Sequence, residues 1–107
     1  MAVYLGEFEY AVLLAVLHLH EEAYAVPVRS LIETRTGRAI ARGALYTALE
    51  RLESKRYLRS RMGEPLAERG GRSRRYFTVT TTGLAALRAA RRALLQLWGG
   101  LEGLLES

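Results

Sequence analysis

The stretch that decides the fold is Arg42-Gly43-Ala44-Leu45-Tyr46-Thr47-Ala48-Leu49-Glu50-Arg51-Leu52-Glu53. A helix advances by about 100° per residue, so the spacing of the apolar residues predicts a helix over residues 42–55 with one apolar face. We expect that face in the core, and it consists of Leu45, Ala48, Leu49 and Leu52. The opposite face is small and polar, and it carries Gly43, Thr47, Glu50 and Ser54. A helix with such a face fits the major groove of DNA, which is about 12 Å wide.

Two strand patterns follow this helix, over residues 57–62 and 74–80. Their alternation predicts a β-hairpin with one inward face and one charged face. The inward face comprises Leu58, Ser60, Met62, Phe77 and Val79, and the outer face comprises Tyr57, Arg59, Arg61, Tyr76 and Thr78. Residues 63–72 are rich in glycine and too long for a tight turn, so they predict a wing tip that is mobile until it meets a partner.

The helix and the stretch Gly71-Arg72-Ser73-Arg74-Arg75-Tyr76-Phe77-Thr78-Val79-Thr80, followed by Gly83, resemble the PadR family of winged-helix transcriptional regulators. The likeness extends to the opening segment 5–17 and so covers nearly the whole chain. Two residues depart from the family. Ala41 stands where many relatives have serine, and it cannot cap a helix with a side-chain oxygen. Arg56 stands where relatives often have glycine, and it would be strained in a left-handed turn.

The segment before the decisive stretch has the pattern of two further helices. Apolar residues at helical spacing predict a largely buried first helix over residues 5–20. We expect a structural or surface role for His18 and His20, because histidines interact favourably with a helix C-terminus. Pro27 suits the first turn of a second helix, and Gly37 suits its left-handed end. The second and third helices would then form a helix-turn-helix.

The predicted fold class is mostly α with a small β-hairpin (α+β), a winged helix-turn-helix with a C-terminal dimerisation helix. A chain of 107 residues suits a single domain with its own core. We expect residues 1–80 to form the DNA-binding part and residues 81–107 to form the dimerisation helix of the same compact unit.

The C-terminal segment predicts a long fourth helix, for which Thr81 or Thr82 suits the N-cap. Its apolar residues recur at alternating spacings of three and four, which is the seam of a coiled coil. The seam predicts a homodimer, and the alternative is that it folds back on the chain's own core. Glycines at 99, 100 and 103 each lower helix propensity by about 1 kcal/mol, so we expect the last turns to kink or fray. The expected dimer interface comprises Leu5, Phe8, Val12, Leu87, Leu94, Leu97, Trp98 and Leu101.

Basic residues are concentrated in the middle of the chain. Between Arg29 and Arg75, thirteen Arg or Lys and five Glu give a net charge of +8, although the whole chain carries only +5. This asymmetry indicates a polyanionic partner. The alternative interpretation is a basic surface that is simply solvated. Thr47, with Arg42 or Glu50, is placed for base edges, and Tyr46 resembles the family's DNA-contacting tyrosine. The expected DNA-binding residues are Arg29, Ser30, Arg42, Gly43, Tyr46, Thr47, Arg51, Lys55, Arg69, Gly71, Arg72 and Arg74.

The composition argues against an enzyme. The chain has no Cys, no Asp and two His close together, so a Ser-His-Asp or Cys-His arrangement cannot be assembled. For the same reason we expect no metal site and no cofactor. The start lacks the basic region of a signal peptide, and the apolar run 11–19 is too short to span a membrane. We expect a cytoplasmic protein without membrane contact.

These features predict a sequence-specific regulator that binds double-stranded DNA at an inverted repeat as a homodimer. The resemblance implies repression, with release by a small aromatic effector that stacks on Trp98 at the dimer interface. The ordinary interpretation of Trp98 is that it belongs to the dimer core. The alternative function is a winged helix whose main role is to bind a small molecule of the multidrug type, or a protein, at that interface.

Overall fold

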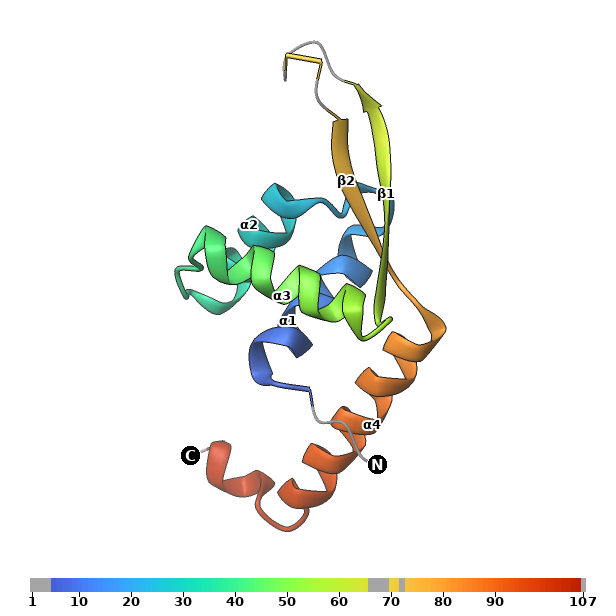
Figure 1. Cartoon of the computed structure of the whole chain (residues 1–107). Coiled ribbons are helices and arrows are strands. Elements are labelled where there is room, and N and C mark those ends of the chain that lie inside the picture. The colour runs from blue at the N-terminus through green and yellow to red at the C-terminus, as the bar shows by residue number, and fades with distance from the viewer. Residues whose placement is uncertain (1–4, 66–69, 72, 107) are drawn as a thin grey trace.

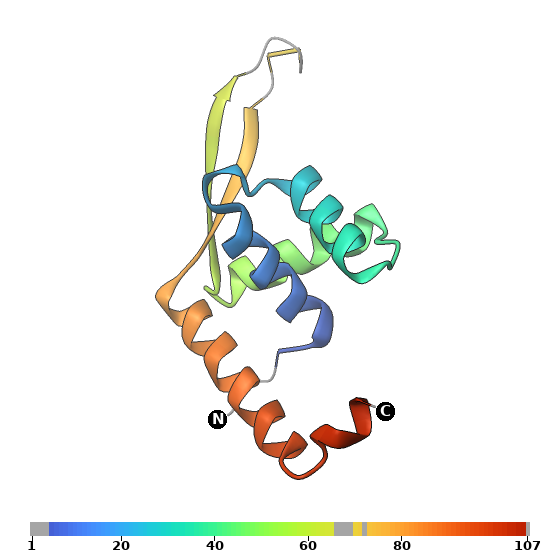
Figure 2. The same cartoon turned by 180° about the vertical axis from the view of Figure 1, so that it is seen from behind.

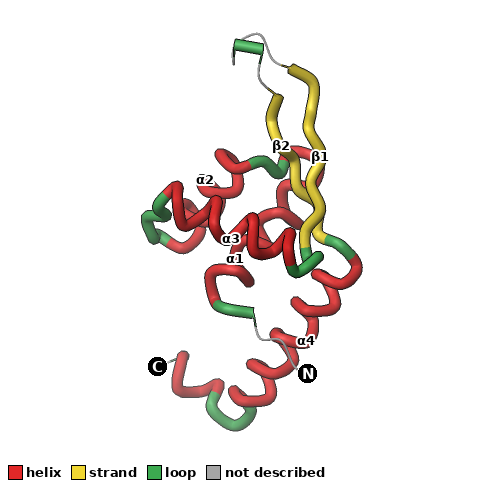
Figure 3. Tube along the Cα trace, in the orientation of Figure 1, coloured by secondary structure: helices red, strands yellow, loops and turns green. Residues whose placement is uncertain are grey.

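The computed structural model describes residues 5–65, 70–71 and 73–106 (Figure 1). In these residues the chain forms mostly helix and one antiparallel hairpin, so the predicted fold class is confirmed (Figure 3). Two of the helices, η1 and η3, are short 3-10 segments. The elements follow in the order α1 (Glu7–Leu19), η1 (His20–Glu22), α2 (Ala25–Thr36), α3 (Arg42–Ser54), β1 (Leu58–Pro65), β2 (Ser73–Val79), α4 (Thr81–Trp98) and η3 (Glu102–Leu105).

The core lies between α1, α2, α3 and the base of the hairpin. The α3 helix turns its predicted apolar face inward, and all four side chains of that face are buried. Each large apolar side chain contributes about 1.5–3 kcal/mol when it is fully buried. Burial therefore fixes the rotation of α3 about its own axis and leaves the small, polar face in solvent. The side chains with almost no exposure are Val12, Leu13, Val16, Val28, Leu45, Leu49, Leu52 and Leu58.

The α2 helix begins and ends as its sequence predicts. Pro27 lies in the first turn, where no partner for a backbone N–H is needed. Gly37 ends the helix with a φ of 73°, and its N–H donates to the carbonyl oxygen of Glu33 (2.9 Å). Glycine adopts this left-handed conformation without steric cost, so the turn between α2 and α3 is set locally.

The hairpin has the predicted alternation from Leu58 onward, but only its base packs inward. Tyr57, predicted on the outer face, is buried in the core with 8% of its surface exposed, because it precedes β1. Strand β1 continues to Pro65, so the prediction that residues 63–65 belong to the wing tip is wrong. Directly opposed pairs include Leu58 with Val79 and Ser60 with Phe77. The N–H of Phe77 also donates to the carbonyl oxygen of Ala23 (2.8 Å), which attaches β2 to the segment after η1. The prediction that Met62 packs inward is wrong, since its side chain is 59% exposed. The hairpin projects past the helices at that point (Figures 1 and 2), so no core is left for the inward face to meet.

The start of α4 is fixed against the start of the hairpin. The N-cap is Thr80, not Thr81 or Thr82, and its hydroxyl accepts from the N–H of Gly83 (3.0 Å) and donates to the carbonyl oxygen of Arg56 (2.6 Å). The sequence pattern missed this cap because the second hydrogen bond joins residues far apart in the chain. Arg56 has a φ of 65°, so a non-glycine residue adopts the left-handed conformation at the turn after α3, where glycine would be less strained.

The α4 helix leaves the core at the end opposite to the hairpin (Figure 2), and the molecule is elongated, with extents of 54 × 34 × 22 Å. The helix ends at Trp98, and Gly100 adopts a φ of 87° before η3 begins. The predicted kink near the C-terminus is therefore confirmed. Because of this turn, η3 does not continue the axis of α4 (Figure 1).

We expect Gly83→Ala to lower the free energy of unfolding by about 1–3 kcal/mol, the usual cost of overpacking. A Cβ at Gly83 would overlap the carbonyl oxygen of Tyr57 and lie 3.0 Å from the carbonyl carbon, so α4 would have to move. Gly43→Ala is the matched control, because a Cβ at that helical glycine meets nothing within 4 Å. The control should match the wild type or gain up to about 1 kcal/mol. Urea unfolding followed by circular dichroism measures both, and an unchanged Gly83→Ala midpoint would contradict the close junction.

Candidate nucleic-acid interface

The exposed face of α3 is unobstructed. Gly43, Thr47, Glu50 and Ser54 are all exposed, as the sequence predicts. Tyr46 stands beside this face with 50% of its surface accessible. Since a Cβ at Gly43 would meet nothing within 4 Å, another molecule can approach the backbone at the start of the helix.

The first turn of α3 has no side-chain cap. Ala41 is the N-cap residue, and its backbone is extended (φ −68°, ψ 137°). The carbonyl oxygen of Ala41 accepts from the N–H of Leu45 (3.1 Å), so the helical backbone bonding is intact. What the turn lacks is the side-chain oxygen that a serine would supply to the backbone N–H groups at the helix start.

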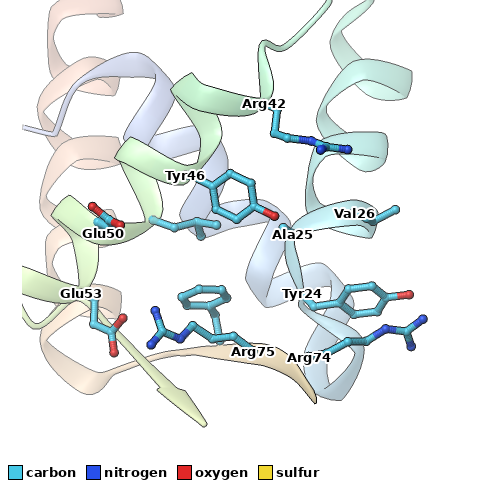
Figure 4. Close-up of a pocket in the computed structure, with 11 residues that line it drawn as sticks. Tyr24, Ala25, Val26, Arg42, Tyr46, Glu50, Glu53, Arg74 and Arg75 are labelled. Carbon is cyan, nitrogen blue, oxygen red and sulfur yellow. The ribbon is translucent and has the colours of Figure 1, made fainter. Parts of the chain in front are cut away.

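A groove of about 430 Å³ separates α3 from β2 and the start of α2 (Figure 4). Arg42 and Tyr46 line it from α3, and Arg74 and Arg75 line it from β2. Three predicted site residues therefore meet in one groove. It also contains two acidic side chains, so its charge is mixed. The other lining residues are Tyr24, Ala25, Val26, Leu49, Glu50, Glu53 and Phe77.

Sequence reasoning missed Arg75 and Tyr24. Arg75 is opposite Met62 on the inward face of the hairpin. Its side chain extends from β2 toward Glu53 of α3 (Figure 4). The alternation of β2 contained this signal, since Arg75 is in phase with the buried Phe77. Tyr24 had no comparable signal, because it comes from the segment before α2 and meets β2 only in the folded chain.

Two of the predicted phosphate-binding residues pair with carboxylates of the chain itself. The Nζ of Lys55 lies 2.8 Å from Oε1 of Glu9 in α1, and the Nε of Arg29 lies 3.7 Å from Oε2 of Glu33. A phosphate would have to compete with these acids. Arg51 and Ser30, by contrast, are exposed at their predicted places on α3 and α2.

The tip of the hairpin is described only in part. Arg69 and Arg72 lie outside the described residues. Gly70 and Gly71 adopt left-handed φ values of 66° and 83°, and a Cβ at either would meet nothing within 4 Å. These conformations favour glycine, and they leave the backbone open to close approach.

The apolar residues of the C-terminal segment are exposed in the single chain. Leu97 is 74% exposed and Trp98 is 38% exposed, so the far part of the stripe does not fold back on the chain's own core. Its near end does. The predicted dimer interface did not include several apolar residues of this surface, which lie on α1, α4 and η3. The exposed large apolar residues there are Leu14, Leu17, Leu94, Leu95, Leu97, Trp98, Leu101, Leu104 and Leu105.

Four of the predicted dimer residues belong wholly or partly to the chain's own core. Val12 is 0% exposed and Leu87 is buried, so the chain's own core covers both side chains in this conformation. Leu5 and Phe8 are partly buried against the same core. The helical spacing could not separate these residues from an interface, because a core face and an interface face have the same period.

Within the described residues, no group of three or more His, Asp or Glu side chains is arranged to hold a metal ion. His18 and His20 are both exposed at the end of α1 and in η1. No helix in the described part of the chain is long and apolar enough to cross a membrane.

A helix-turn-helix whose exposed second helix is followed by a basic hairpin defines the chain as a winged helix-turn-helix protein. The model of the transcriptional regulator PadR-like family matches residues 13–89. The chain belongs to this family of transcriptional regulators.

Solved structures agree with this assignment. A PadR family regulator from Eggerthella lenta is 30% identical, with 90% of this chain and 81% of that chain covered and a TM-score of 0.67. A PadR-like regulator from Bacillus cereus (17% identity, 94% and 92% covered, TM-score 0.73) shares the fold. So does a putative transcriptional regulator from Thermoplasma acidophilum (17% identity, 91% and 91% covered, TM-score 0.70). None of the curated proteins matches the chain.

We expect Ala41→Ser to raise the free energy of unfolding by about 0.5–2 kcal/mol, the range that a serine N-cap contributes. The extended backbone at Ala41 already has the conformation in which a serine hydroxyl reaches the first-turn N–H groups. Ala39→Ser is the matched control, because Ala39 is exposed and precedes the helix. Thermal unfolding measures both, and an equal gain in the two variants would mean that capping is not the cause.

Proposed function

We propose that the chain is a homodimeric repressor that binds an inverted-repeat operator in double-stranded DNA. The observation that carries this proposal is the α3 helix. Its apolar face is held in the core, and the face left in solvent is small and polar over most of its length. Such a helix enters the major groove without steric conflict and brings Thr47 close to the base edges.

The residues beside α3 support the contacts that hold such a helix in place. Phosphates line both sides of the major groove, and most hydrogen bonds to DNA go to phosphate and sugar. Arg42, Tyr46 and Arg51 are exposed along α3. We assign Tyr46 and Arg51 to phosphates, and we assign Arg42 to a phosphate in place of a base edge, because it lines the same groove as Arg74 and Arg75. Arg75 would contact the same strand from the hairpin side of the groove. Glu50 either accepts from a cytosine amine or neutralises a neighbouring arginine.

The hairpin would reach the adjacent minor groove. Its open glycine backbone at Gly70 and Gly71 supports close approach to DNA there. The arginines that flank these glycines in sequence, Arg69 and Arg72, have the side chain that a narrow minor groove favours. In this proposal α3 reads base edges and the hairpin reads the shape of the groove.

The homodimer is supported by the exposed leucines of α4 and η3. Soluble monomers rarely expose a contiguous apolar surface of this kind, so a partner surface is expected to cover it. A second copy offers the same leucines, as a two-fold interface requires. Two α3 helices related by that axis would read half-sites about 34–36 Å apart, one turn of DNA.

Repression follows if the dimer occupies a promoter in the cytoplasm and excludes the polymerase. An effector would act by changing the angle between the terminal helices, and with it the spacing of the two α3 helices. Trp98 supports a flat aromatic ligand for this role, because it is partly exposed among leucines near the end of α4. The same observation supports the second candidate function, in which binding of a small molecule or a protein at the interface is the main task.

We expect binding to the DNA upstream of the protein's own gene, with protection of an inverted repeat that resists a scrambled competitor. Affinity should fall steeply with salt, because each phosphate contact releases counterions. Arg42→Ala should weaken binding to all sequences alike and reduce the salt slope by about one phosphate per subunit. Footprinting and fluorescence anisotropy over a salt series measure these effects.

Arg92→Ala is the matched control for Arg42→Ala. It removes the same charge from an exposed position on α4, away from the groove, and its salt slope should equal that of the wild type. Equal affinity of the wild type for scrambled DNA would refute a sequence-specific regulator. Equal slopes for Arg42→Ala and Arg92→Ala would refute the role of Arg42.

We expect Leu97→Glu to convert the dimer to a monomer at micromolar concentration, because it places a charge in the middle of the proposed interface. Gln96→Glu is the control, since it adds the same charge at an exposed neighbouring position that points away from the leucine stripe. Sedimentation equilibrium gives both masses. A Leu97→Glu dimer as stable as the Gln96→Glu dimer would place the interface elsewhere.

A further inference from the structure

Four side chains form a continuous stack where the hairpin meets the start of α2. The guanidinium carbon of Arg61 lies 4.7 Å from the ring centroid of Tyr76, and that of Arg74 lies 4.3 Å from the ring centroid of Tyr24. The two rings meet edge to face, with centroids 5.5 Å apart and an interplanar angle of 68°. Each contact lies within the range in which aromatic and cation–π pairs attract.

The ring of Tyr76 packs directly over Gly63 of β1. A Cβ at Gly63 would lie 2.6 Å from Cε2 and 3.2 Å from Cδ2 of Tyr76, so the ring occupies the space that any other residue would need. An aromatic ring that covers a glycine of the neighbouring strand also holds the register of the two strands. Gly63 therefore lets Tyr76 lie close to β1 while its edge meets Tyr24.

Tyr24 connects this contact to the helix-turn-helix. It is the N-cap residue of α2, its backbone is extended (φ −119°, ψ 175°), and its side chain makes no capping hydrogen bond. The side chain is used in the stack instead. Together with the hydrogen bond from Phe77 to Ala23, the stack fastens the hairpin to the segment that begins α2.

The position of the stack along the hairpin matters for its effect. Phe77 is buried against the core, but the inward face is already exposed at Met62. Beyond Arg74 the hairpin projects past the helices (Figures 1 and 2). The stack is thus near the last place at which the body of the protein can fix the direction of the hairpin.

We propose that Tyr24 and Tyr76 are positioning residues, which fix the angle between the hairpin and the helix-turn-helix so that α3 and the hairpin reach adjacent grooves of DNA together. The consequence for DNA rests on the proposed function, but the effect on the angle does not. The role requires the aromatic rings and not the tyrosine hydroxyls.

The angle can be measured without DNA. The sequence contains no cysteine, so spin labels at Thr34→Cys in α2 and Glu64→Cys in β1 are the only ones attached. Labelled chains are diluted into excess unlabelled chains, and pulsed electron paramagnetic resonance then gives the distance distribution within one chain. Tyr24→Leu should broaden or shift this distribution, and Tyr24→Phe, which keeps the ring, should leave it unchanged.

Gly63→Ala is an independent variant that changes neither tyrosine. It displaces the ring of Tyr76 from its position over β1 and should broaden the distribution as Tyr24→Leu does. If circular dichroism shows that Tyr24→Leu does not fold, Gly63→Ala alone tests whether the rings fix the angle of the hairpin. Wild-type distributions in Gly63→Ala and in folded Tyr24→Leu would overturn the proposal.

The effect on DNA is tested with a duplex selected from a random pool by the wild-type protein. Tyr24→Leu should bind it about tenfold more weakly, which is about 1.4 kcal/mol. It should lose hydroxyl-radical protection in the minor groove yet keep protection of guanine N7 in the major groove from dimethyl sulfate. A merely structural defect would weaken both kinds of protection together.

Tyr24→Phe separates positioning from direct contact. Wild-type protection by this variant supports the proposal, whereas a loss equal to that of Tyr24→Leu would show that the hydroxyl touches DNA and would overturn it. If the wild type selects no sequence while the spin-label result holds, the proposed function fails and the positioning role of the two rings stands.

Discussion

The junction between residues 56–57 and residues 80–83 is the constraint on which the rest of the arrangement depends. Here the N–H of Tyr57 donates to Leu52 of α3 (2.9 Å), and the N–H of Thr80 donates to Tyr57 (3.0 Å). The hydroxyl of Thr80 joins the carbonyl of Arg56 to the first turn of α4. One cluster of hydrogen bonds thus ties together α3, both ends of the hairpin and α4. The direction of α4 relative to the end of α3 is therefore set by hydrogen bonds at this one junction.

Ion pairs within the chain neutralise some of the basic side chains in the described residues and leave others there without a carboxylate partner. The start of α1 supplies two carboxylates, of which Glu7 pairs with Arg38 and Glu9 pairs with Lys55. The Glu9 side chain is only 14% exposed, so its pair is less screened by solvent than an ordinary surface pair. These contacts hold α1 to the regions before and after α3. Because Lys55 is paired, the positive charge that α3 itself presents to solvent comes from the exposed Arg42 and Arg51.

Local patterns predicted the elements well, and contacts between distant segments account for what they missed. The apolar face of α3 and the end of α2 at Gly37 follow from helical spacing and backbone preference, which are local properties. The cap at Thr80 depends on a carbonyl that lies across the junction. The exposure of Met62 depends on where the helices end beneath the hairpin, which no strand pattern contains.

The candidate site was predicted to a similar extent. Spacing alone placed Tyr46 and Thr47 on the exposed side of α3 and assigned basic residues to the hairpin. It could not show that Lys55 meets Glu9, because these residues come from different helices. Nor could it show that Val12 is core and Leu97 is surface, since both lie on apolar stripes and only the folded chain determines which stripe is covered.

The projection of the hairpin makes it a lever arm. From Arg61 to the end of β1 at Pro65 the strand extends roughly 13 Å, at about 3.3 Å per residue. A tilt of about 10° at the base would then displace the end of the strand by about 2–3 Å, nearly half the width of a minor groove of about 6 Å. A long arm extends the reach of a small protein, but it also multiplies every angular error at its fulcrum. Rigidity in such a molecule is therefore needed most at the base of the arm, far from the surface that the arm touches.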